Sequence, residues 1–83
     1  MTSGEEWDEL CEQFRKAQTR ERKAAEIVTA KFALIGQGLS RDNPTIDEMA
    51  EWDAAQDVVS TIRAMMKDFL LREAKRRAAA HRG

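Results

Sequence analysis

Apolar residues recur every three to four positions along two long stretches of the chain. The first stretch contains Trp7, Leu10, Cys11, Phe14, Ala17, Ala24, Ala25, Val28, Phe32 and Ile35. The second contains Ile46, Met49, Trp52, Ala55, Val59, Ile62, Met66, Phe69 and Leu70, and Val58 and Met65 widen its stripe. Because this spacing is that of an amphipathic helix, the sequence predicts helices over residues 4–35 and 46–79.

The segment between these stretches, residues 36–45, is predicted to be a loop. It opens with Gly-Gln-Gly at 36–38 and includes Pro44, and the residue before a proline is pushed out of the helical region. Thr45 followed by Glu48 matches a capping box at the start of the second helix. The chain is therefore predicted to be a single helical-hairpin domain over residues 1–83, with a short basic tail at 80–83.

Formal charge alternates in four blocks along the sequence. Residues 1–12 carry five acids and no base, and residues 13–31 carry six bases and two acids. Residues 41–57 carry six acids and one base, and residues 58–83 carry seven bases and two acids. A chain that turns back near residue 40 places acidic blocks beside basic ones, which favours an antiparallel hairpin.

The two stripes also give a register for this hairpin. Pairing them across the loop predicts that Trp7 faces Glu73, Phe14 faces Met66 and Val28 faces Trp52.

Both stripes are wider than one helix seam, and a hairpin of 83 residues leaves much apolar surface exposed. The predicted fold class is thus an all-α antiparallel two-helix hairpin that self-associates into a four-helix bundle.

Between Ala17 and Ala25 the stripe of the first helix is thin, and Glu21 stands where an apolar residue is expected. One interpretation places Glu21 at the rim beside Arg20 or Lys23, so that Glu21→Leu would stabilise the fold by about 1 kcal/mol. The alternative is a buried polar group that fixes the register or the oligomer size.

The most apolar stretch of the chain provides the candidate partner-binding residues, Met65, Met66, Phe69, Leu70 and Leu71. Such a cluster forms either the core of a homodimeric bundle or a groove for the helix of another protein, because methionine adapts to irregular partners. The sequence therefore favours a small non-enzymatic adaptor, regulator or inhibitor that binds a protein partner.

Two basic clusters support an alternative function, in which a helical dimer contacts nucleic acid phosphates. The first cluster is Arg15, Lys16, Arg20, Arg22 and Lys23, and the second is Arg72, Lys75, Arg76 and Arg77. The net charge of −1 gives no overall attraction to nucleic acid, and the chain contains no tyrosine for a stacking platform. Nucleic acid is for these reasons the less favoured partner.

Cysteine and histidine, which often act in catalytic and metal sites, occur only once each in the sequence. Cys11 lies on the apolar side of its helix among acids, which indicates a buried and inert thiol, and His81 has no second ligand near it for zinc. The sequence predicts no enzyme activity, cofactor or metal. No signal peptide and no run of about 18 apolar residues is present, so we expect a cytoplasmic protein without a membrane span.

The hairpin layout is similar to that of small plasmid-type RNA-regulating hairpins, which dimerise into four-helix bundles. It is also similar to that of small secretion-system hairpins with a Trp-x-Gly turn, but the turn here, Gly36-Gln37-Gly38, has no tryptophan. The first likeness implies dimerisation, and neither transfers site residues to this chain.

Overall fold

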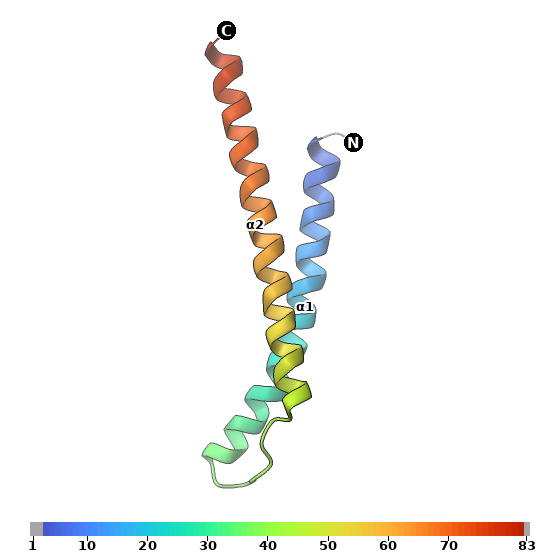
Figure 1. Ribbon diagram of the computed structural model, residues 1–83, viewed down its shortest axis with the longest axis vertical. Coiled ribbons are helices and arrows are strands. Elements are labelled where there is room, and N and C mark those ends of the chain that lie inside the picture. Colours follow the sequence, from blue (N-terminus) through green and yellow to red (C-terminus); the bar gives the residue numbers. More distant parts are fainter. Residues whose placement is uncertain (1–2, 83) are drawn as a thin grey trace.

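The computed structural model describes residues 3–82, apart from the side chains of Ser3, His81 and Arg82, and it is an antiparallel pair of long helices. Helix α1 spans Ser3–Gly36 and helix α2 spans Ile46–Arg82. Figure 1 shows both chain ends at one end of the molecule, the open end, and the connecting loop at the other. The hairpin is elongated, with extents of 67 × 21 × 16 Å. The predicted all-α helical hairpin is thereby confirmed.

The helix bounds differ from the sequence prediction mainly at the end of α2. α1 extends the predicted helix by one residue at each end, and α2 begins at the predicted residue 46. However, α2 continues to Arg82, so residues 80–82 of the predicted tail are helical. Alanines occupy 78–80, and residues 46–82 include no glycine or proline, so nothing local ends the helix earlier.

The C-terminus of α1 is closed by a Schellman motif. The backbone N–H of Leu39 donates to the Leu34 carbonyl at 3.0 Å, and that of Gly38 donates to the Ile35 carbonyl at 3.0 Å. Gly38 has a φ of 73°, in the left-handed region that glycine adopts without strain. The second glycine of the Gly-Gln-Gly turn therefore reverses the chain.

The predicted capping box at the start of α2 is present. The Glu48 backbone N–H donates to Thr45 Oγ1 at 3.0 Å, and the Thr45 backbone N–H donates to Glu48 Oε1 at 2.8 Å. Lys31 of α1 adds an ion pair to the same carboxylate, with its Nζ 2.5 Å from Glu48 Oε1. Hydrogen bonds from Lys31 and from the Thr45 backbone lower the pKa of Glu48. The start of α2 is thus tied both to its own first turn and to α1.

The core is a single seam between the two helices. Its buried residues are Leu10, Ala17, Ala24 and Val28 from α1 and Ala55, Val59, Ile62 and Phe69 from α2. Phe14 and Met66, predicted to face each other, both pack against the cluster formed by Ala17, Val59 and Ile62. The predicted stripes therefore meet, and the alanines allow the helices to approach closely in the middle of the seam.

Ion pairs across the seam follow the predicted charge alternation only in part. Arg72 lies 3.3 Å from Glu6, and Arg20 forms two hydrogen bonds to Glu51, of 2.6 and 3.1 Å. Arg76, expected beside the acids of α1, pairs instead with Glu73 one turn earlier in α2. Exposed ion pairs of this kind each add little to the free energy of unfolding. Their main effect is to favour the antiparallel arrangement over a parallel one.

The structure corrects the prediction for Glu21. The side chain is half-buried, and Glu21 Oε1 accepts a hydrogen bond of 3.1 Å from the indole Nε1–H of Trp52. Trp52 was expected opposite Val28, two turns further along α1. The neighbouring Arg20, one of the predicted rim partners, is engaged by Glu51 across the seam. The carboxylate therefore accepts a hydrogen bond from a polar group of α2 and makes no ion pair with Arg20 or Lys23.

We expect Glu21→Leu to lower the free energy of unfolding by about 1 kcal/mol, because a half-buried indole N–H loses its charged acceptor. This loss outweighs the apolar gain of the leucine, reversing the expectation for a rim position. Glu21→Gln keeps an oxygen acceptor and is the matched control, expected to stay close to the unchanged protein. Thermal unfolding at one protein concentration measures both variants, and a Glu21→Leu protein more stable than the parent would contradict the hydrogen-bond role.

Candidate partner-binding surface

The five predicted partner-binding residues lie on different sides of α2. Phe69 is buried, with 6% of its surface exposed, and Met66 is half-buried against the core. Met65, Leu70 and Leu71 are 45%, 53% and 49% exposed. At 3.6 residues per turn, consecutive positions point about 100° apart, so adjacent residues cannot share a narrow face. Of the five predicted residues, Met65, Leu70 and Leu71 are therefore the exposed ones, and Phe69 and Met66 belong to the contact with α1.

Leu70 borders a groove between the helices at the open end, which we call the Trp7–Leu70 groove. Its volume is about 350 Å³, and its lining residues are Gly4, Trp7, Phe69, Leu70, Glu73, Ala74 and Arg77. The Trp7 and Phe69 rings form the aromatic contact of this groove, with centroids 5.4 Å apart and planes tilted by 31°. Arg72 lies over the Phe69 ring, its guanidinium carbon 5.9 Å from the centroid.

The rim of the Trp7–Leu70 groove is open and carries one uncompensated base. A Cβ added at Gly4 would have no atom of a described residue within 4 Å, apart from its chain neighbours and the backbone of its own helix. Glu73 is held by Arg76 at 2.7 Å, whereas Arg77 makes no ion pair with another described residue. The groove therefore combines an apolar lining with a cation that can meet an incoming carboxylate.

Trp7 is the residue of this surface that sequence reasoning missed. The sequence pattern assigned it only to the helix stripe, facing Glu73, and both residues do line the same groove. An amphipathic tryptophan in the first turns of a hairpin helix, near a leucine-rich helix end, is the signal that could have marked it.

Met65 and Leu71 border a second groove, which we call the Leu10–Met65 groove. Its volume is about 360 Å³, and its lining residues are Glu6, Leu10, Met65, Asp68, Leu71, Arg72 and Lys75. Glu6 and Arg72, which both line this groove, form one of the ion pairs between α1 and α2. Four of its seven lining residues are charged, compared with two of the seven that line the Trp7–Leu70 groove.

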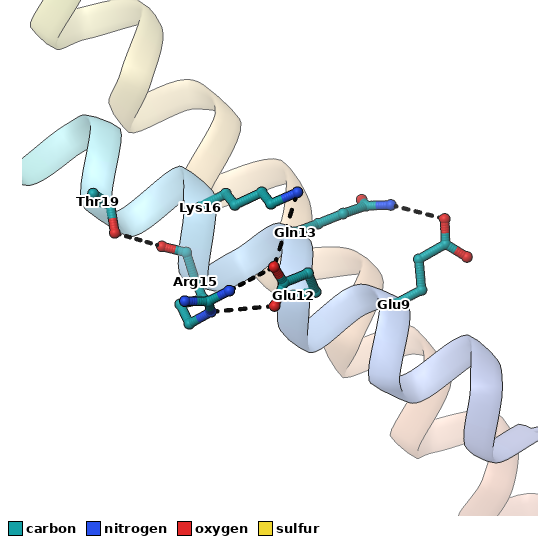
Figure 2. Close-up of polar contacts among 6 residues, drawn as sticks. All are labelled: Glu9, Glu12, Gln13, Arg15, Lys16 and Thr19. Atoms are coloured by element: carbon teal, nitrogen blue, oxygen red, sulfur yellow. Dashed lines mark hydrogen bonds and ion pairs between the residues drawn. The ribbon is translucent and has the colours of Figure 1, made fainter.

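The basic cluster of α1 is largely neutralised by acids. Figure 2 shows Glu12 between Arg15 and Lys16, with nitrogen-to-oxygen distances of 2.5 and 3.9 Å. The hydrogen bond from Arg15 lowers the pKa of Glu12, and the hydrogen bond from Arg20 likewise lowers the pKa of Glu51. These carboxylates are therefore charged at neutral pH, and three of the five bases already have anionic partners.

Arg22 and Lys23 are the members of that cluster that make no ion pair with a described residue. In the second cluster Arg72 and Arg76 are paired, and Lys75 and Arg77 form no ion pair within the described part of the chain. The bases that could reach a phosphate are thus divided between the middle of α1 and the end of α2.

The remaining chemical groups add little to this surface. Cys11 has a free thiol and is half-buried, less enclosed than the sequence predicted, and the His81 side chain lies outside the described part of the structure. Among the described residues no three histidine, cysteine, aspartate or glutamate side chains are grouped so that they could hold a metal ion. Neither helix, as described, contains an apolar stretch long enough to cross a membrane.

Comparison with known proteins yields no match among family models, curated proteins or solved structures.

Proposed function

We propose that this chain is a non-enzymatic adaptor, regulator or inhibitor that binds an amphipathic helix of another protein in the Trp7–Leu70 groove. The observation that carries the proposal is the 53% exposure of Leu70 beside the Trp7 and Phe69 rings. Because Leu70 is half exposed beside this aromatic lining, an apolar side chain of a partner that covers it stabilises the complex. Helix-in-groove recognition uses this combination of an apolar lining and a charged rim.

The charges of the rim define the chemistry of the partner. Arg77 has no ion pair among the described residues, and the lining acid Glu73 is already paired with Arg76. An unpaired base beside an apolar groove favours a helix that carries a carboxylate next to its apolar face. The proposed partner is therefore an amphipathic helix with leucine-like anchors and acidic flanking residues.

Two fluorescein-labelled helical peptides test this proposal by fluorescence anisotropy. Both carry leucines on one face at a spacing of three and four residues, and one has glutamate and the other lysine at the flanking positions. We expect the glutamate peptide to bind at least about tenfold more tightly, and its affinity to fall as salt rises, because a solvent-exposed charge contact is screened.

Leu70→Glu and Leu71→Glu are matched variants for this measurement, since the two leucines are adjacent in α2 and similarly exposed. Leu70→Glu is expected to abolish binding of the glutamate peptide, and Leu71→Glu to preserve it, because Leu71 does not line the Trp7–Leu70 groove. Equal loss in both variants, or no binding of either peptide by the parent protein, would refute the proposed groove.

The alternative function, nucleic acid binding, predicts a different result. Generic RNA or duplex DNA would bind at low salt, the affinity would fall steeply with salt, and replacing Arg22 and Lys23 by glutamine would weaken it. That pattern, with no peptide binding, would replace the proposed function.

A further inference from the structure

α2 carries a second apolar seam that α1 does not cover. The residues of this second seam are Ala54, Val58, Thr61 and Met65, spaced four, three and four positions apart. All four are exposed, and the two large ones, Val58 and Met65, are 38% and 45% exposed. Each residue of the second seam comes one position before a residue that packs against α1, namely Ala55, Val59, Ile62 or Met66. The second seam therefore runs parallel to the contact with α1, about 100° around the helix.

The spacing of the second seam is that of a helix contact. Alternating steps of four and three residues keep side chains on one line along a helix, as in a two-helix seam. No charged residue belongs to it, whereas charge dominates both ends of α2. Another helix is the structural element that such a line of side chains fits.

The charges of α2 identify which helix that is. Residues 46–57 carry five acids and no base, and residues 58–82 carry seven bases and two acids. The boundary between the halves falls within the second seam. A helix that lies antiparallel to α2 and has the same order of charges from N- to C-terminus is complementary to it, because acid then lies beside base, and a second copy of α2 has that order.

We propose that two copies of the chain associate through the second seam of α2, with the two α2 helices antiparallel about a twofold axis near Thr61. The acidic half of each α2 then lies beside the basic half of its partner. Asp47 and Lys75 make no ion pair with a described residue, so both remain available for pairing between the copies. Such an interface is self-complementary, as twofold symmetry requires. The product is a four-helix bundle with α2 helices inside and α1 helices outside.

Cysteine cross-linking tests the antiparallel arrangement, with Cys11→Ala as the background. A residue close to a twofold axis meets its own copy, so Thr61→Cys should form a disulfide-linked dimer under mild oxidation. Ala54→Cys should not, because seven residues from Thr61 along an antiparallel pair separate the two copies by roughly 20 Å. A mixture of Val58→Cys and Met65→Cys chains should cross-link, since the two positions lie three residues before and four residues after Thr61. Efficient linking of Ala54→Cys to itself would indicate parallel helices and overturn the proposal.

Oligomeric state in solution provides the second test. By light scattering at micromolar concentration, the parent protein is expected at twice the 9.5 kDa of one chain. Met65→Asp should weaken dimerisation at least about tenfold, because it places a carboxylate in the seam. Leu70→Asp is the matched control, since Leu70 is exposed on another side of α2, and it should remain dimeric. Circular dichroism verifies that each variant is helical.

A helical monomer for the parent protein, or a dimer that Met65→Asp leaves unchanged, would overturn the proposed interface. Failure of the proposed dimer interface would leave the proposed peptide binding in the Trp7–Leu70 groove unaffected. Leu70 variants change peptide binding and preserve the dimer, and Met65 variants do the reverse.

Discussion

Val59→Asp is expected to lower the free energy of unfolding by about 3 kcal/mol or more, the largest effect of any substitution considered. Val59 is 8% exposed and belongs to the core cluster with Ala17 and Ile62. An aspartate there loses the apolar contacts of valine and places a carboxylate among the buried side chains of the core. Arg63 lies one turn away, but the acids Glu21 and Asp57 border the same region and offset its attraction.

Ser60→Asp is the matched control for that variant, because it adds the same charge one position along α2 on an exposed residue. Its stability is expected to stay within about 0.5 kcal/mol of the parent protein. Thermal unfolding followed by circular dichroism compares the two at equal protein concentration, since association makes the midpoint depend on concentration. Equal midpoints for Val59→Asp and Ser60→Asp would show that position 59 is not in the core.

Phe69→Ala is expected to lower the free energy of unfolding by about 3 kcal/mol, the low end of the range for deleting a buried aromatic side chain. Phe69 is buried, its ring packs against Trp7, and the Arg72 guanidinium lies over it. Removing the ring therefore removes the main contact that joins α1 to α2 at the open end. Denaturation by urea measures the change, and tryptophan fluorescence reports on the surroundings of Trp7 and Trp52 together at the same time.

Leu70→Ala is the control, one position further along α2 and half exposed. Because about half of its surface is already exposed to water, its truncation is expected to cost less than about 1 kcal/mol, while it weakens binding of the acidic peptide. This pair of variants separates a core residue from a partner-binding residue within the stretch that the sequence treated as one cluster. Similar losses of stability for both would mean that Leu70 is covered in solution, and would favour burial of that face within an oligomer.

The elements of this fold could be predicted from the sequence because their causes are local. The three- and four-residue spacing sets the helices, the Thr45–Glu48 box starts α2, and the Gly-Gln-Gly turn ends α1 within a few residues. The antiparallel direction follows from the order of charge along the chain, and Glu6 with Arg72 realises it across 66 positions of sequence. Each of these features depends either on residues that are close in sequence or on the net charge of a whole block of residues. A small shift of register between the helices changes neither.

The assignment of individual side chains depended on the tertiary structure. The stripe of α2 is wider than one seam, so the sequence could not tell that Phe69 is buried while Met65, Leu70 and Leu71 point elsewhere. Only the packing of α1 decides which line of the stripe is covered. The Glu21–Trp52 hydrogen bond likewise joins residues 31 positions apart at a distance of 3.1 Å, and a shift of one residue between the helices would break it. Helical spacing determines which residues share a stripe, and the rotation and register of the partner helix determine which of them remain available for binding.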